Sequence, residues 1–250
     1  MKLFGFGAIA LAVSASLLHA EETCDNKSFY LGSYLVINDL ANIKGSMCIS
    51  ADLKSNSLSW LTKANASPIE YGSPTGYDHA PCYPRVQRNL GYSPLSSVSS
   101  LHTSMWYEYT GSANDASLVT LNLLIGSKPA LVPALDILKT PSIQIMVILS
   151  VHGNESPTWL NTKIVSIEIG IYAFDLFVGE IGGVTIYTYL ARSVIVKLDV
   201  DVTEFYKKLP KEYIIDDSQC LIALQAGTQI NGIVNAELKV LDFSVDLMLK

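Results

Sequence analysis

Apolar and polar residues alternate with a period of two along most of this chain, and this pattern constrains its fold more than any other feature. The segments that show it, each rich in Val, Ile, Leu, Tyr and Thr, are 118–124, 143–151, 164–169, 184–190, 221–226 and 236–247. Clusters of Gly, Pro, Asn and Ser separate them. Successive side chains of a β-strand point to opposite faces, so the alternation predicts strands with one buried face. Many short strands separated by turn signals predict an all-β sandwich or jelly roll.

One segment departs from this pattern and predicts a helix. Asp201 is a suitable N-cap, Glu204 lies early in the segment 201–209 and Lys207 and Lys208 lie late, as the helix dipole prefers. Pro210 ends the segment. The sequence therefore predicts one short helix beside the strands.

The segment 143–149 assigns its side chains to two faces. Ile143, Ile145, Val147 and Leu149 share one face and are predicted to lie in the core. Gln144, Met146 and Ile148 share the other face. A Gln in so apolar a strand either lies at an exposed face as a structural amide or lines a cleft, and the strand pattern leaves both possibilities open.

The first 20 residues have the organisation of a secretory signal peptide. Met1-Lys2 is a short positive region, residues 3–18 are apolar and small, and Ala20 precedes an acidic pair. Removal of residues 1–20 leaves 21–250, which is the length of one domain. We therefore expect a secreted, extracellular protein that does not span a membrane.

Four cysteines remain in an exported chain, namely Cys24, Cys48, Cys82 and Cys220, and their even number favours two disulfides. Three pairings are possible. No CxxC or HxxxH spacing occurs, so neither a metal nor a cofactor is predicted. With 17 Lys and Arg against 23 Asp and Glu, the formal net charge of −6 argues against nucleic acid as a partner.

Several motifs, taken in order, resemble those of glycoside hydrolase family 12, the endo-β-1,4-glucanases and xyloglucan-specific endoglucanases. They are Y-L-V-I-N-D-L at 34–40 between Cys24 and Cys48, S-W at 59–60, Y-P-R-V-Q at 83–87, the segment 95–106, and A-G-T-Q at 226–229. The resemblance implies a monomeric, concanavalin-like jelly roll of two antiparallel sheets. It also implies a concave groove for a β-1,4-glucan or xyloglucan chain and one helix on the convex side. It further implies a Cys24–Cys48 bridge, which leaves Cys82 and Cys220 for the second.

The catalytic positions of the family carry amides in this chain. The resemblance puts the nucleophilic glutamate at Gln144, the acid/base glutamate at Gln229, and an assisting aspartate at Asn122. Retaining hydrolysis needs one carboxylate as nucleophile and one carboxylic acid as proton donor. An amide keeps the shape of these groups but does not ionise. We therefore predict that these three residues are non-functional in hydrolysis.

The same resemblance implies sugar contacts by Asn38, Trp60, Trp106 and Met146. For the two tryptophans, packing in the fold is an equal alternative. The family has tryptophan where this chain has Ala41 and Ile148, which predicts weaker stacking on sugar rings.

Three functions follow from these residues. The first is an inactive relative that binds β-glucan or xyloglucan, or an inhibitor protein directed against active glucanases. The alternative is an active endo-β-1,4-glucanase or xyloglucanase whose carboxylates come from other positions, with Glu108, Glu155, Glu168, Asp175 and Glu180 as candidates. The third is a secreted structural protein that binds no sugar.

Overall fold

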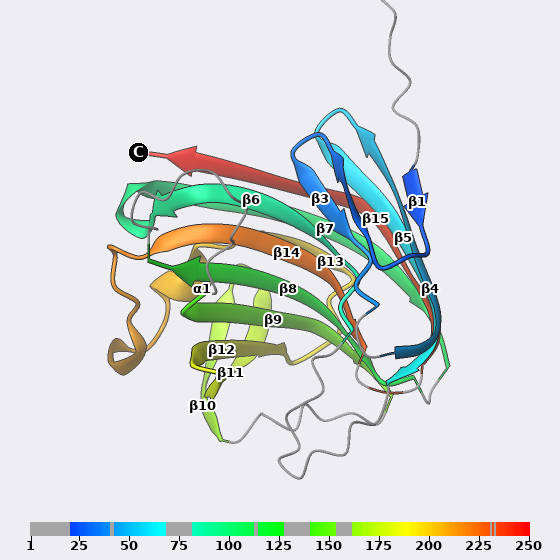
Figure 1. Ribbon diagram of the computed structural model, residues 1–250. Coiled ribbons are helices and arrows are strands. Elements are labelled where there is room, and N and C mark those ends of the chain that lie inside the picture. Colours follow the sequence, from blue (N-terminus) through cyan, green and yellow to red (C-terminus); the bar gives the residue numbers. More distant parts are fainter. Residues whose placement is uncertain are drawn as a thin grey trace, which may run out of the picture.

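Two β-sheets packed face to face form the body of the molecule (Figure 1). The computed structural model describes residues 21–40, 43–68, 82–112, 115–127, 141–153, 162–230, 232 and 234–250. The six-stranded sheet has the order β1 (Glu21–Thr23), β4 (Ile43–Lys54), β5 (Ser57–Pro68), β15 (Val234–Leu249), β7 (Val98–Thr110) and β13 (Lys197–Asp201). The nine-stranded sheet has the order β10 (Lys163–Ile169), β11 (Tyr172–Ile181), β12 (Val184–Ala191), β9 (Ile143–His152), β8 (Ser117–Gly126), β14 (Cys220–Ile230), β6 (Arg85–Pro94), β3 (Tyr34–Ile37) and β2 (Ser28–Leu31).

The predicted strands are confirmed. Each alternating segment of the sequence lies in a strand, in the order β8, β9, β10, β12, β14 and β15. The strands of both sheets bend in the same sense, with the nine-stranded sheet on the inner side of the bend (Figure 1). We call the face of this sheet that points away from the six-stranded sheet the concave face. The opposite outer surface, on the six-stranded sheet, is the convex face.

One strand pair departs from the expected antiparallel arrangement. β12 pairs with β9 in parallel, with Tyr187 opposite Ile145. β10 and β11 lie between these two strands in the chain and are added beyond β12 in the sheet. A crossover of this length permits parallel pairing, whereas a tight hairpin requires antiparallel strands. The nine-stranded sheet is therefore mixed.

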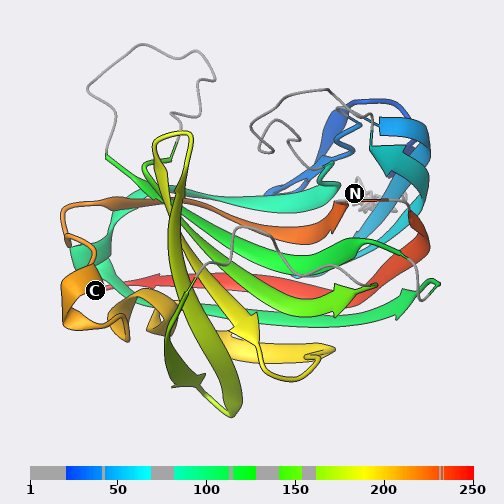
Figure 2. The ribbon, with the colours of Figure 1, turned by 90° about the horizontal axis from the view of Figure 1, so that it is seen from below.

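The helix forms where the sequence predicts it but is shorter. α1 spans Glu204–Lys207, and Asp201 ends β13 instead of capping the helix. The Asp201 carboxylate accepts hydrogen bonds from the backbone N–H groups of Thr203 and Leu101. The helix lies at the end of the sandwich near the C-terminus (Figure 2). Two 3-10 turns, η1 (Leu95–Ser97) and η2 (Lys211–Tyr213), complete the helical elements of the described chain.

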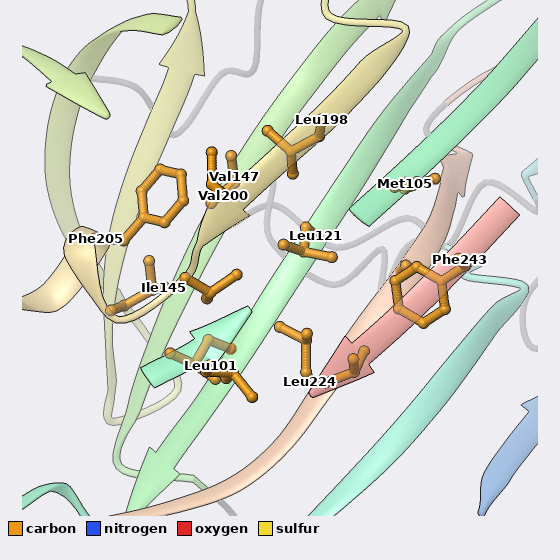
Figure 3. Close-up of a cluster of buried hydrophobic side chains, with 14 of the residues drawn as sticks. Leu101, Met105, Leu121, Ile145, Val147, Leu198, Val200, Phe205, Leu224 and Phe243 are labelled. Carbon is orange, nitrogen blue, oxygen red and sulfur yellow. The ribbon is translucent and has the colours of Figure 1, made fainter. Parts of the chain in front are cut away.

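The main hydrophobic core fills the space between the two sheets (Figure 3). Leu121, Ile145 and Val147 enter it from the nine-stranded sheet, and Met105 and Phe243 enter it from the six-stranded sheet. Leu149 is buried in the same core and Ile143 packs against it, as predicted from the alternation in β9. Gln144, Met146 and Ile148 consequently point to the concave face.

The cysteines form one disulfide among the described residues, and the second predicted bridge is wrong. Cys24 and Cys48 are bonded, as the resemblance implies. Cys82 and Cys220 are buried free thiols. Cys82 pairs through its backbone, in an isolated β-bridge, with Ile230 at the last position of β14, whereas Cys220 is the first residue of that strand. At about 3.3 Å per residue the two cysteines are roughly 30 Å apart, whereas a disulfide requires Cα atoms within about 7 Å.

The signal peptide predicted for residues 1–20 lies outside the described residues. Within the described chain, no helix is long and apolar enough for a membrane span.

Candidate functional site

The concave face carries the amides that the sequence singles out. Leu121 and Leu123 point from β8 into the core, so Asn122 between them points to the concave face. Gln144 and Gln229 point to the same face from β9 and β14, because Gln144 precedes the core residue Ile145 and Gln229 is an odd number of positions, three, after the core residue Ala226. Strand alternation therefore places all three amides on one side of the nine-stranded sheet.

Asn122 and Gln144 are in direct contact. Gln144 Nε2 donates a hydrogen bond of 3.0 Å to Asn122 Oδ1. Asn122 is opposite Met146 in the β8–β9 ladder, and Gln144 is opposite Leu124, so the two amides are diagonal neighbours on one face. Asn122 is 2% exposed, whereas Gln144 is partly exposed. Gln144 is therefore the member of the pair that a ligand on this face can reach.

Two hydroxyl groups extend the contact from Asn122 toward β6. Asn122 Nδ2 donates to Tyr83 Oη at 2.8 Å and to Thr120 Oγ1 at 3.3 Å. Thr120 Oγ1 in turn donates to Tyr83 Oη at 3.2 Å. Burial raises the pKa of Tyr83, and the hydrogen bonds from Thr120 and Asn122 oppose this only in part. The phenol therefore stays neutral, and Gln144, Asn122, Thr120 and Tyr83 form an uncharged chain, which we call the amide chain.

A second set of amides lies beside this chain. Gln225 in β14 is opposite both Asn122 in β8 and Gln87 in β6. Gln225 Nε2 donates to Gln87 Oε1 at 2.7 Å, and Gln87 Nε2 donates to Asn89 Oδ1 at 2.7 Å. The concave face thus carries hydrogen-bonding groups across four neighbouring strands, and none of these groups titrates near neutral pH.

Gln229 lies on the same face but farther along the strands. It is opposite Leu118, four positions along β8 from Asn122, which is about 13 Å at 3.3 Å per residue. The hydrogen bonds described for Asn122 and Gln144 do not include Gln229. The structure therefore brings two of the three predicted amides together and leaves the third apart.

A charged pair, formed by Arg85 at the start of β6 and Asp39 after the end of β3, lies beside the strand that carries Gln229. Arg85 is opposite Gly227, two residues before Gln229, and its Nη1 is 3.0 Å from a carboxylate oxygen of Asp39. The same Nη1 donates to the Tyr83 carbonyl at 2.8 Å. Both charges are largely buried, with 20% and 27% of the Arg85 and Asp39 side chains exposed. The Asp39 carboxylate is therefore held by a guanidinium group.

An apolar cluster occupies the concave face beside the amide chain. Leu118, Met146, Ile148 and Ile186 pack together there, and Met146 is 6% exposed. Met146 thus lies on the face that the resemblance implies, directly opposite Asn122 in the β8–β9 ladder. Ile148 fills a position for which the family has tryptophan, with an aliphatic side chain that is fully buried.

Three predicted sugar contacts lie elsewhere in the fold. Trp60 is 3% exposed in the core between the sheets, where its ring meets Phe243 edge-on at 5.4 Å. Trp106 is 47% exposed on the convex face, because its neighbours Met105 and Tyr107 point into the core. Asn38 is fully buried, and its Nδ2 donates to the carbonyls of Thr23, Asp25 and Met47. Asn38 therefore holds the N-terminal segment, and none of these three residues lies on the concave face.

The carboxylates proposed as replacements are not on the central strands of this face. The strands β12, β9, β8, β14, β6, β3 and β2, seven neighbours in the sheet, contain no Asp or Glu. Glu108 is on the convex face, 3.5 Å from Lys239, so this candidate does not line the concave face. Asp175 in β11 lies within 4 Å of Lys163 and Arg192. Glu168 and Glu180 are exposed on β10 and β11, and Glu155 lies outside the described residues.

A metal site has no support in the described chain. The one group of potential ligands there is Glu22, Cys24 and Cys48, and its two sulfur atoms are joined in the disulfide. The seven neighbouring strands that lack Asp and Glu offer amides, hydroxyls and arginine side chains, which can bind neutral polar molecules.

The family is decided by comparison with known sequences. The model of glycosyl hydrolase family 12 matches residues 32–248. The chain belongs to this family. Among its family relatives, a probable xyloglucan-specific endo-β-1,4-glucanase A from Aspergillus niger is 26% identical over 255 residues, which cover 99% of this chain and 100% of the relative. The xyloglucan-specific endo-β-1,4-glucanase 1 of Phytophthora sojae is 26% identical, with 98% of each chain covered.

A third relative of this family 12 protein has a different description. The inactive glycoside hydrolase XLP1 of Phytophthora nicotianae is 25% identical, covering 95% of this chain and 96% of the relative. Among solved structures, endoglucanase 3 of Trichoderma harzianum aligns with a TM-score of 0.77 at 22% identity over 92% of this chain and 98% of that one. The Humicola grisea Cel12A catalytic domain, in complex with a thio-cellotetraose, aligns with a TM-score of 0.76 at 20% identity, covering 91% and 99%. These structures share the fold of this family 12 chain.

Sequence reasoning missed four contributors to the concave face, namely Tyr83, Gln87, Thr120 and Gln225. A signal for each was present. Tyr83 and Gln87 are part of the Y-P-R-V-Q motif, and Thr120 and Gln225 alternate with core residues in predicted strands. Their contacts join strands β6, β8 and β14, which are far apart in the sequence.

Proposed function

We propose that this protein is a secreted family 12 protein that has lost hydrolase activity and acts by binding. Its ligand would be a β-1,4-glucan or xyloglucan chain on the concave face. Secretion is supported by the signal-peptide pattern of residues 1–20 and by the Cys24–Cys48 disulfide, which is typical of exported proteins.

The observation that carries the proposal is the amide chain. If Gln144 corresponds to the family nucleophile, the residue beside it, Asn122, is neutral as well. A neutral amide is a very poor nucleophile, and Gln229 has no proton to donate to a leaving sugar. Loss of the nucleophilic carboxylate removes the two-carboxylate mechanism instead of slowing it, and Gln229 lies about 13 Å along the strands from Asn122, beyond the distance of about 5–5.5 Å that a retaining pair spans.

An active enzyme with displaced carboxylates has less support. Retention requires two carboxyl groups about 5–5.5 Å apart, and inversion requires about 6.5–9.5 Å. Seven neighbouring strands of the sheet contain no acid, and Asp39, which lies near Gln229, is paired with Arg85. One oxygen of the Asp39 carboxylate therefore already accepts a hydrogen bond from the Arg85 guanidinium.

Binding is compatible with the same residues. Gln144 uses one N–H on Asn122, so its carbonyl oxygen and second N–H remain for the hydroxyl groups of a sugar. The apolar cluster of Leu118, Met146, Ile148 and Ile186 offers less stacking surface than a tryptophan. We therefore expect weaker binding of the chain than by an active relative.

A protein ligand is a second candidate, favoured by one comparison. The relative described as an inactive glycoside hydrolase covers almost the whole chain. An inactive protein that keeps the family fold can present a surface that an inhibitor of active glucanases recognises. Under this function the protein binds such an inhibitor, and polysaccharide binding is dispensable.

The proposal is tested by measuring release of reducing sugar from xyloglucan and from β-glucan. We expect none from the wild-type protein. Binding to the same polymers is followed by retardation in gels that contain them, and we expect Gln144→Ala to weaken it. The triple variant Asn122→Asp, Gln144→Glu, Gln229→Glu tests whether slight hydrolysis returns when all three acids are restored. Clear turnover by the wild type that is lost in Gln144→Ala or Gln229→Ala would overturn the proposal.

A further inference from the structure

The convex face carries an ordered polar surface around an exposed tryptophan. Six outward-facing side chains on β7, β13 and β15 compose it, and we call them the convex strip: His102, Ser104, Trp106, Asp199, Asp242 and Ser244. Cross-strand pairing sets their positions, because Ser104 is opposite both Asp199 and Ser244, and Trp106 is opposite Asp242. The strip therefore runs along β7 on the outer surface of the six-stranded sheet, on the opposite side of the sandwich from the concave face.

A β-bulge determines what lies beside the tryptophan. The register of β15 shifts between Val240 and Asp242 against β7, and between Val240 and Phe243 against β5. The extra residue turns Asp242 outward at the position opposite Trp106, while Val240 and Phe243 stay in the core. Bulges often redirect a side chain at a binding surface. On the other side, Lys197 Nζ is 5.7 Å from the centre of the Trp106 ring.

Hydrogen bonds orient the polar members of the strip. Ser104 Oγ is 2.9 Å from Ser244 Oγ and donates to Asp242 at 3.3 Å. Ser57 Oγ also donates to Asp242, so this carboxylate is held from two sides. His102 Nε2 is 2.9 Å from Asp199, at the far end of the strip from Trp106. An aromatic ring with fixed acceptors and hydroxyls along one line is a preorganised arrangement.

We propose that the convex strip is a second binding site, for a neutral β-1,4-linked polysaccharide chain. Such a chain is flat, with apolar ring faces and equatorial hydroxyl groups at its edges. Its ring faces suit the exposed indole of Trp106, and its hydroxyls suit the carboxylates and serines beside it. This site is independent of the concave face and does not need Gln144.

The composition of the strip favours a sugar over a protein. The centre of a protein interface is desolvated and apolar, with several large side chains. Trp106 is the one large apolar side chain among the six, and its neighbours along β7 are Ser104 and the exposed Glu108. A sugar needs one apolar ring with polar groups beside it, and this is what the strip provides.

The test uses the full chain in gels that contain xyloglucan, hydroxyethyl cellulose or, as an α-linked control, pullulan. We expect both β-linked polymers to retard the wild type and pullulan to leave its migration unchanged. Trp106→Ala should weaken retardation about fivefold, because an aromatic contact of this kind contributes roughly 1 kcal/mol. Ile214→Ala, which removes an exposed apolar side chain from the segment after η2, is the control and should bind as the wild type does.

Trp106→Phe provides a second measurement that does not depend on an alanine variant. Addition of xyloglucan should change the tryptophan fluorescence of the wild type, and Trp106→Phe should remove that change. Unchanged retardation in Trp106→Ala on both β-linked polymers would overturn the proposal, as would loss of all retardation in Gln144→Ala. A different result would assign the strip to a protein partner instead. In that case a column of immobilised cationic protein would retain the wild type but not Trp106→Ala, and Trp106→Ala would leave retardation by the polysaccharides unchanged.

Discussion

Removal of the Cys24–Cys48 disulfide is expected to lower the stability of the protein by a calculable amount. The bridge joins residues with a sequence separation of 24. For a loop of this size, the chain-entropy treatment gives about 3.5 kcal/mol at 25 °C. In the folded state Asn38 holds the same segment through three backbone carbonyls, so the fold should survive without the bridge. The change therefore acts mainly on the unfolded chain.

The double variant Cys24→Ser, Cys48→Ser should melt about 7–14 °C below the wild type, at about 2–4 °C per kcal/mol for a domain of this size. Thermal unfolding followed by circular dichroism measures this shift. Reductant should lower the melting temperature of the wild type by the same amount and leave the double variant unchanged, since Cys82 and Cys220 are free thiols. A variant that melts within about 2 °C of the wild type would refute the entropy argument. A further loss on reduction would show that a second bridge exists.

Three other changes test the packing and the polar contacts. Trp60→Ala should cost about 3–5 kcal/mol in urea unfolding, whereas Trp106→Ala should cost less than about 0.5 kcal/mol, because the first ring is in the core and the second is exposed. Asn122→Leu should cost about 1–3 kcal/mol, because Gln144 Nε2 loses its acceptor and Tyr83 keeps only the bond from Thr120, whereas Asn122→Asp keeps an acceptor for Gln144 and should cost less; equal losses would contradict the role of the amide chain. Burial lowers the pKa of His152 below 6.5, so the unfolded chain binds a proton more tightly than the folded protein does. As far as this group is concerned, the folded state has its full stability above about pH 6.5 and loses stability as the pH falls toward the folded pKa. The urea midpoint should therefore fall more between about pH 7.5 and pH 5 in the wild type than in His152→Gln.

The strands were predictable because their signal is local. In β9, alternate residues are buried in the core, and this pattern can be read from ten consecutive positions. The contact between Asn122 and Gln144 could be anticipated only through the family resemblance, since it joins two strands. The helix was located correctly by its charges and Pro210, but its start depended on Asp201 bonding to Leu101 of another strand.

The two tryptophans illustrate what alternation leaves open. A period of two states which residues share a face of a strand, but it does not state which face meets the other sheet. Trp60 in β5 and Trp106 in β7 belong to the same six-stranded sheet, on either side of β15, yet one side chain points into the core and the other to solvent. Which face each tryptophan takes depends on how β5 and β7 pair with β15, the strand between them, which has a bulge after Val240.

The amino-acid sequence by itself determined that this is an all-β family 12 protein with amides at its expected catalytic positions, because strand periodicity and residue chemistry are properties of short segments. The tertiary structure alone decided which side chains meet. It separated Cys82 from Cys220 by the length of β14, joined β9 to β12 in parallel, and put Trp106 on the convex face. These outcomes depend on strand order and register, which are set by the burial of the whole core and not by any one segment.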